Sequence, residues 1–181
     1  MGVEKRMADR CNTIRLYSFQ TDVVYQVLKR DGVCYSKEEY VRKKYKESAK
    51  VFINAYGWFV KEVQHIVPKP EGAEYPYWAF TDLYNVDQTG DGHVLTLDVP
   101  IGEAILFDMF DWTKIMQMHY IGENESEEAT FSEELKNMGM NEFQIMTSNF
   151  YPEQKARIQE SWKRLFGHQQ AIEAGDNSGV H

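Results

Sequence analysis

The sequence predicts a single α+β domain in which a small, mostly antiparallel sheet is flanked by helices. Two kinds of segment predict this class: some alternate polar and apolar residues, as half-buried strands do, and others place apolar residues three and four positions apart, as helices do. No repeat and no linker separates them, and 181 residues is the length of one domain. We therefore expect a polar arm over residues 1–12, one globular domain over 13–167 and a polar tail over 168–181.

The strands are predicted from alternation and from β-branched and aromatic content. Residues 13–19 and 93–99 both alternate in this way. The Asp- and Gly-rich stretch over 87–92 is typical of a turn, so we expect 93–99 to form a hairpin with a strand over 75–83. Two short additional strands are predicted over 33–35 and 104–107.

Two helices are predicted in the first half of the chain. Thr21 is suited to cap the first helix, whose apolar residues follow at three-and-four spacing. Gly32 ends this helix, because glycine accepts the left-handed conformation found after helix ends. The second helix, over 51–67, gathers apolar residues on one face, and Pro68 and Pro70 end it.

The second half of the chain is predicted to be mainly helical. Asp108 is suited to cap one helix, and a second is predicted over 131–138. Residues 143–146 fit either a strand or a loop. Pro152 stands near the first turn of a final helix, where its missing N–H costs little, and Gly167 ends that helix.

The charge distribution argues against a nucleic-acid partner. The chain carries 28 acidic and 20 basic residues, for a formal net charge of −8. Such an excess repels a phosphate backbone, so we expect no duplex nucleic acid as a partner. A locally basic stretch over 37–50 is interpreted either as a solvated helix face or loop, or as a phosphate-binding patch.

Cysteine usage and hydropathy predict a cytoplasmic protein. The two cysteines, Cys11 and Cys34, have no metal-ligand spacing, and the turn over 87–92 lacks the ligand pattern of a calcium loop. We therefore expect no metal. Residues 1–10 are charged and lack the apolar run of a signal peptide, and no segment reaches the roughly 18 apolar residues that cross a bilayer.

An ordered set of short motifs runs from residue 13 to 166 and carries a family resemblance. The motifs are Ile14-Arg15-Leu16-Tyr17, Asp31-Gly32-Val33, Ala55-Tyr56-Gly57-Trp58, Pro70-Glu71-Gly72, Tyr75-Pro76-Tyr77-Trp78-Ala79, Val99-Pro100, Leu106-Phe107-Asp108, Asp111-Trp112 and Glu160-Ser161-Trp162-Lys163-Arg164-Leu165-Phe166. Together they resemble domain-of-unknown-function family 3841 of bacterial and phage proteins. The resemblance implies no activity, and this chain is short after its tryptophan strand, where members commonly have a longer segment.

The opening strand, helix and Asp-Gly-Val turn also resemble, more weakly, the start of ADP-ribosyltransferase-like domains. In those domains an Arg or His of the first strand holds the phosphates or ribose of NAD, and the resemblance implies this role for Arg15 and NAD as the cofactor. A guanidinium group matches a pyrophosphate through paired hydrogen bonds. The chain has no Glu-x-Glu pair on a late strand, so Glu103 is the loosely placed candidate for the catalytic acid.

The remaining candidate ligand-binding residues are aromatic and acidic side chains. Tyr17, Trp58 and Trp78 could stack on a nicotinamide or adenine ring, although large aromatics also dominate the cores of small domains. Asp108 and Asp111 would line the same cleft, although both also suit a helix start. The histidines come with no triad pattern, which argues against hydrolase chemistry.

Two functional hypotheses follow. In the first, the chain is a nucleotide-engaging enzyme of the NAD or ADP-ribose type, with Arg15 on a phosphate and a tryptophan on the base. This hypothesis predicts a pocket that contains both. In the second, it is an acidic interaction or inhibitor protein without catalytic activity, possibly of phage origin, whose acidic stretch over 123–134 binds a basic partner protein. The second predicts no cleft and carboxylates clustered on one face.

Overall fold

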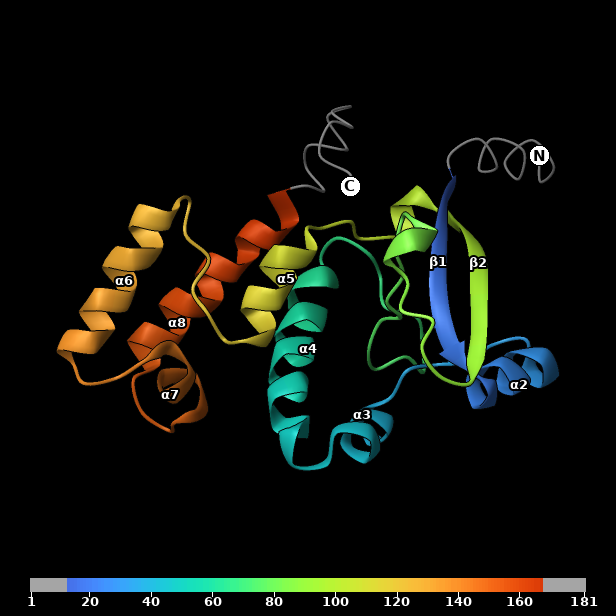
Figure 1. Cartoon of the computed structure of the whole chain (residues 1–181), viewed down its shortest axis with the longest axis horizontal. Helices are drawn as coiled ribbons and strands as arrows, with labels where there is room; N and C mark the ends of the chain where they lie inside the picture. Colours follow the sequence, from blue (N-terminus) through green and yellow to red (C-terminus); the bar gives the residue numbers. More distant parts are fainter. Residues whose placement is uncertain (1–12, 168–181) are drawn as a thin grey trace.

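The structure is a computed structural model that describes residues 13–167. The arm over 1–12 and the tail over 168–181 lie outside the described residues. The elements form one α+β arrangement: the two strands lie at one end of the molecule, α6, α7 and α8 lie at the other, and α4 stands between them (Figure 1). The predicted fold class is confirmed.

The sheet consists of β1 (Thr13–Thr21) and β2 (Gly92–Pro100), which pair antiparallel along their whole length. Leu16 lies opposite Leu97 in this register. The two strands predicted over 13–19 and 93–99 are therefore present. Their pairing joins segments that are far apart in the sequence, and β2 does not form the hairpin that we expected.

The prediction of a strand over 75–83 is wrong. This segment has no regular ladder and meets β1 at one isolated bridge, where Tyr17 and Phe80 exchange two backbone hydrogen bonds of 2.8 Å. Two local features explain this. Pro76 has no N–H to donate to a ladder, and Asp82 accepts a hydrogen bond from the backbone N–H of Tyr84, which bends the chain into a 3₁₀ turn.

The two short strands predicted over 33–35 and 104–107 are also absent. The first region contributes only an isolated bridge between Ser36 and Tyr75. The second follows a 3₁₀ turn over Ile101–Glu103 and leads directly into the cap of the next helix. Neither segment pairs with a neighbouring strand in a ladder.

The first half contains three helices, of which the sequence predicted the first and the third. Their bounds are α2 (Asp22–Asp31), α3 (Glu38–Tyr45) and α4 (Ala49–Val63). Thr21 precedes α2 but makes no capping hydrogen bond with its side chain, whereas Gly32 ends α2 at φ 73°, as expected. Helix α4 ends at Val63, before the predicted residue 67, and a turn connects it to Pro68.

The helices of the second half are α5 (Met109–Met116), α6 (Glu125–Asn137), α7 (Glu142–Thr147) and α8 (Pro152–Ser161), followed by a 3₁₀ turn over Trp162–Phe166. Helix α6 begins before the predicted residue 131 because Asn124 accepts a hydrogen bond from the N–H of Glu127. The ambiguous segment 143–146 is helical, since Asn141 and Gln144 form a capping box.

The core lies among α4, α5, α6, α7 and α8, and its largest fully buried side chains include Trp162, Ile115 and Leu135. The indole N–H of Trp162 donates to the carbonyl oxygen of His119 at 2.6 Å, and the hydroxyl of Ser161 accepts from the N–H of Ile121 at 3.0 Å. The end of α8 and the 3₁₀ turn after it therefore fix the connection between α5 and α6.

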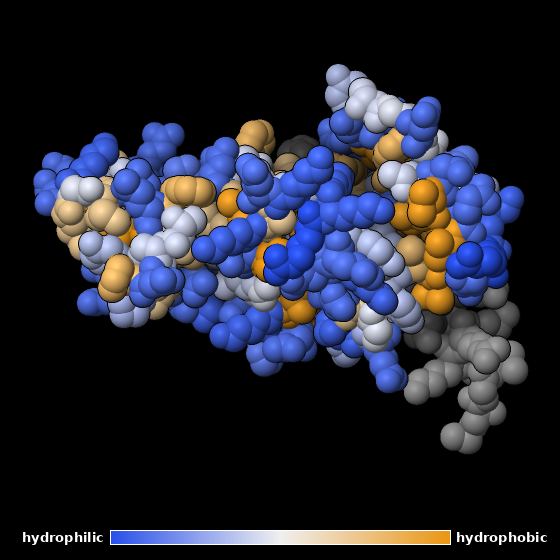
Figure 2. All heavy atoms as spheres, turned by 90° about the horizontal axis from the view of Figure 1, so that it is seen from below, coloured by the Kyte–Doolittle hydropathy of each residue, from blue (hydrophilic) through white to orange (hydrophobic). Residues whose placement is uncertain are grey.

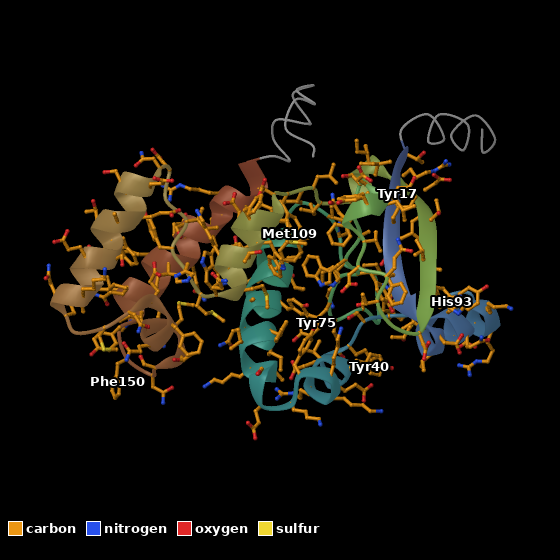
Figure 3. All side chains as sticks on the ribbon, in the orientation of Figure 1. Tyr17, Tyr40, Tyr75, His93, Met109 and Phe150 are labelled. Carbon is orange, nitrogen blue, oxygen red and sulfur yellow. The ribbon has the colours of Figure 1, made fainter. Side chains whose placement is uncertain are left out.

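Apolar side chains also reach the surface. On the face seen in Figure 2, hydrophobic residues gather over the end of the molecule that carries the strands and α2. Tyr75 lies between α4 and the strands (Figure 3). No helix within residues 13–167 has the length and apolar character needed to cross a membrane.

Candidate functional site

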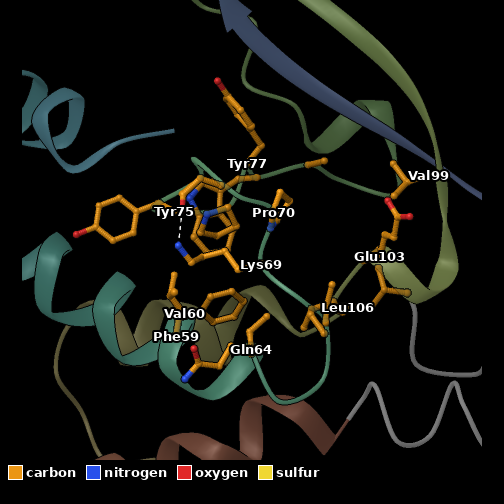
Figure 4. Close-up of a pocket in the computed structure, with 18 of the residues that line it drawn as sticks. Phe59, Val60, Gln64, Lys69, Pro70, Tyr75, Tyr77, Val99, Glu103 and Leu106 are labelled. Carbon is orange, nitrogen blue, oxygen red and sulfur yellow. Dashed lines mark hydrogen bonds between the residues drawn. The ribbon is translucent and has the colours of Figure 1, made fainter. Parts of the chain in front are cut away.

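A cavity of about 340 Å³ lies between α4 and the sheet. Four parts of the chain form its walls: the last turns of α4, the segment 67–79, one face of the β1–β2 sheet and the segment 103–107 (Figure 4). Most of the lining residues are aliphatic, aromatic or proline. A concave, largely apolar site with a few polar groups is the usual form of a small-molecule pocket.

The alternation of side chains along each strand determines which sheet residues face this cavity. Leu16, Leu97 and Val99 line it. Because successive side chains of a strand point to opposite faces, Arg15, Tyr17 and their partners in β2 lie on the other face. The cavity therefore meets the apolar face of the sheet.

Trp78 forms the aromatic wall. Its ring centroid lies 4.8 Å from that of Trp112 and 5.9 Å from that of Phe107. The backbone of Trp78 is fixed by the hydroxyl of Ser18, which donates to the carbonyl oxygen of Trp78 at 2.7 Å. Ser18 is 3% exposed, so this hydrogen bond is sheltered from water. These contacts hold the indole ring at the cavity in one orientation.

Three polar side chains lie among the apolar lining: Gln64, Lys69 and Glu103. Lys69 donates to the carbonyl oxygen of Ala73 at 2.5 Å, which is the dashed line in Figure 4. Glu103 is exposed and belongs to the 3₁₀ turn that follows β2. The cavity thus offers one ammonium group, one carboxylate and one amide to a ligand.

Two tyrosine hydroxyls anchor the segment 75–79 to the first residue of α3 and to the chain before it. The hydroxyl of Tyr75 donates to Oε2 of Glu38 at 3.2 Å, and burial, followed by this carboxylate, raises the pKa of Tyr75 to about 12. The hydroxyl of Tyr77 donates to Sγ of Cys34 at 3.0 Å, and its pKa is also raised, first by burial and then by Cys34. Both phenols are therefore held in the neutral form.

Of the site residues expected from the sequence, Trp78 and Glu103 line the cavity. Arg15 lies on the opposite face of the sheet, where its side chain is 62% exposed and pairs with Asp98 at 2.8 Å. This contact raises the pKa of Arg15 and lowers that of Asp98. Tyr17 shares the face of Arg15.

The other expected residues lie outside the cavity lining. Trp58 is buried in the helical core, with its ring centroid 5.2 Å from that of Trp162. Asp108 caps α5 by accepting a hydrogen bond from the N–H of Phe110 at 2.6 Å. Asp111 lies in the first turn of the same helix.

Sequence reasoning missed Gln64, Lys69 and Phe107 as site residues. The signal that pointed to the first two was the Pro-Lys-Pro run after the longest predicted helix. That run follows the turn after α4 and belongs to the segment 67–79, which lines the cavity. Phe107 lies in a segment that the sequence presented as a buried strand.

The acidic stretch before and within α6 has internal partners. Glu127 accepts from the hydroxyl of Tyr120 at 2.6 Å and from the N–H of Glu123 at 2.6 Å, and these hydrogen bonds lower its pKa. Burial opposes ionisation of Glu128, but its hydrogen bond with Lys114 at 2.6 Å contributes to a net lowering of its pKa. Residues 13–167 contain no group of three His, Cys, Asp or Glu side chains arranged to hold a metal ion.

Comparison with known proteins gives a family but no activity. No curated protein and no solved structure matches the chain. One family model matches residues 15–180 and so spans the strands, the cavity and the helical core. The chain therefore belongs to the family described as Domain of unknown function (DUF3841).

Proposed function

We propose that this protein binds a small molecule through a flat, nucleobase-sized ring that occupies the cavity between α4 and the sheet. The observation that carries the proposal is the combination, in one space of about 340 Å³, of an apolar lining, an aromatic wall and three polar side chains. That volume lies at the lower end of the range for small-molecule sites, which suits a single ring system better than a whole dinucleotide.

The aromatic wall supports a ring as the ligand. Trp78 is packed against Trp112 and Phe107 and is tied to β1 through Ser18. A ring that is already held in place loses little freedom when a ligand stacks on it, so more of the contact energy remains for binding. Stacking of a base on an aromatic side chain is worth about 1–3 kcal/mol.

The polar side chains support a ring that carries an N–H donor. A carboxylate accepts such a hydrogen bond, and Glu103 is the carboxylate of the lining. Gln64 can both donate and accept. The amino group of adenine and the carboxamide of nicotinamide both have this chemistry. The ligand class therefore agrees with the base of the NAD or ADP-ribose type of ligand expected from the sequence.

The proposal differs from that expectation in how a phosphate would be held. Arg15 is on the other face of the sheet and already pairs with Asp98. Lys69 is the cationic side chain of the cavity lining. A phosphate attached to the ring would therefore extend toward Lys69, and Arg15 would contribute nothing to binding.

The direct test is calorimetric titration with adenosine, nicotinamide, AMP and ribose 5-phosphate. The first three contain a flat aromatic ring and are expected to bind saturably, whereas ribose 5-phosphate, which has only a sugar ring, is not. Binding of ribose 5-phosphate as tight as that of AMP would contradict the proposal, as would the absence of binding by adenosine, nicotinamide and AMP.

A cavity-filling variant gives the matched control. Val60 lines the cavity, and Val60→Phe would occupy part of it, so we expect ring binding to weaken about tenfold or more. Val23→Phe makes the same change on α2 at an exposed position outside the lining, and should leave binding unchanged. Equal binding by both variants would show that the ring sits elsewhere.

A further inference from the structure

The outer edge of β2 presents unpaired backbone groups. Tyr17 exchanges both of its backbone hydrogen bonds with Phe80, so its N–H and C=O point away from β2. Thr96 lies opposite Tyr17, and this is consequently a non-hydrogen-bonded pair of the β1–β2 ladder. The N–H and C=O of Thr96 therefore point outward, and by alternation so do those of Val94 and Asp98.

Nothing in the described chain covers these groups. Within residues 13–167 no backbone hydrogen bond reaches Val94, Thr96 or Asp98 from the outer side. Helix α2 packs only at one end of the edge, where Tyr25 stacks on His93 with 3.9 Å between ring centroids. In Figure 1, β2 is the outermost strand, with α2 at its lower end.

This edge also lacks the features that usually prevent strand addition. Monomeric proteins protect an edge with lysines, with a proline inside the strand or with a bulge. The register of β2 with β1 is continuous over nine residues, its only proline is the last residue, and Asp98 is its only Asp, Glu, Lys or Arg. A two-stranded sheet is also marginal unless further strands or helices extend it.

We propose that this edge is an interaction surface for a second copy of the chain. The two β2 strands pair antiparallel about a two-fold axis at Thr96, so that two strands from each copy form one continuous sheet. In this register Leu95 lies opposite Leu97 of the second copy, which pairs aliphatic side chains on the cavity face.

Charge supports this register over its neighbours. With the axis at Thr96, Asp98 lies opposite Val94 of the second copy. An axis at Asp98 would place two aspartates directly opposite each other, which is destabilising. An axis at Val94, Leu95 or Leu97 would leave part of each strand unpaired. With the axis at Thr96, Gly92 lies opposite Pro100 of the second copy, so this arrangement pairs β2 along its whole length.

The first experiment measures molar mass by sedimentation over about 1 μM to 1 mM, a range that covers weak, reversible association. Wild type is expected to form a reversible dimer. The dimer should be tighter at high salt, because two copies with a net charge of −8 repel each other. A monomer at every concentration and salt would overturn the proposal. So would a dimer whose dissociation constant is unchanged in the β2 variants described next.

Two variants at one position test the register without breaking the β1–β2 ladder. Val94→Asp would place a carboxylate opposite Asp98 of the second copy, and the dissociation constant should rise about tenfold. Val94→Lys would place an ammonium group there, and the dissociation constant should fall. Equal effects of the two variants would reject this register.

Thr96→Pro tests the backbone hydrogen bonds. It removes an outward N–H and no bond to β1, so the protein should stay folded by circular dichroism and become monomeric. Thr96→Val keeps the N–H and should stay dimeric. If Thr96→Pro unfolds, the Val94 pair decides the question. If wild type stays monomeric but captures an added strand peptide, the surface belongs to another partner and the homodimer is wrong.

Discussion

The hydroxyl of Ser18 in β1 donates a hydrogen bond of 2.7 Å to the carbonyl oxygen of Trp78, which forms the aromatic wall of the cavity. Gln20 in turn donates to the hydroxyl of Ser18 at 2.7 Å. A small polar residue on the apolar face of the sheet thus connects two segments that have no regular ladder between them. The shape of the cavity depends on this connection.

Removing this hydroxyl should loosen the wall. Ser18→Ala leaves the carbonyl oxygen of Trp78 without its donor in a sheltered place, and we expect the free energy of unfolding to fall by about 1–3 kcal/mol. Denaturant unfolding measures this change. Ser126→Ala is the control, because Ser126 is exposed in the first turn of α6. Equal stability of the two variants would mean that the Ser18 contact contributes nothing.

The carboxylate of the cavity should select ligands with an N–H group. Glu103→Gln removes the charge while keeping the size of the side chain, and we expect the affinity for adenosine or nicotinamide to fall about tenfold. Glu71→Gln makes the same change nearby, at an exposed residue outside the lining. If both variants bind as wild type does, Glu103 does not contact the ligand.

Arg15 should be dispensable for ring binding. Arg15→Ala breaks an exposed ion pair with Asp98 on the face away from the cavity. Such pairs contribute little to stability, so the folding transition should hardly move. Calorimetry should give a dissociation constant for AMP within about twofold of wild type, below the effect of one hydrogen bond. Loss of AMP binding would instead restore the phosphate-holding role that the sequence implied.

The hydroxyl of Tyr75 makes stability depend on alkaline pH. Its pKa is raised to about 12, whereas a tyrosine in the unfolded chain titrates near 10. The unfolded state therefore loses its proton first. The stabilisation is fully present below about pH 10 and is lost as pH rises toward 12.

Comparing wild type with Tyr75→Phe isolates this contribution. Burial also raises the pKa values of Tyr56 and Tyr77, and these two residues are common to both proteins. The unfolding free energy of wild type should fall more steeply between about pH 10 and pH 12 than that of the variant. Parallel curves would show that the phenol of Tyr75 is not held neutral.

Local patterns predicted the elements better than they predicted pairing. Alternation located both strands, and Gly32 ended α2 as expected. The partner of β2 was missed because a turn signal before Gly92 favoured a local hairpin, whereas the register with β1 joins residues about eighty positions apart. Periodicity within a segment carries no information about such a partner.

The sequence contains capping signals for α6 and α7 that our prediction did not take into account. Asn124 stands three residues before Glu127, and Asn141 stands three residues before Gln144. Both spacings fit the capping-box pattern, although only the second forms the complete box. These two signals predict an earlier start for α6 and a helix after Asn141.

The site was only partly predictable for a physical reason. Alternation already separated Arg15 and Tyr17 from Leu16, and this separation places the first two away from the cavity. The weak resemblance of β1 to the first strand of ADP-ribosyltransferase-like domains favoured Arg15, which lies on the face of the sheet away from the cavity. The cavity itself is formed where α4, the segment 67–79, the sheet and the segment 103–107 meet, and no single stretch of sequence describes that meeting.

The indole N–H signals in a two-dimensional ¹H–¹⁵N spectrum test the central claim most directly, because the chain has four tryptophans. Trp78 lines the cavity, Trp112 packs against it, and Trp58 and Trp162 pack together in the helical core. Added adenosine or nicotinamide should shift the Trp78 signal saturably and most strongly, and leave those of Trp58 and Trp162 in place. If the chemical shift of the Trp78 indole N–H does not change with adenosine or nicotinamide, the account is wrong.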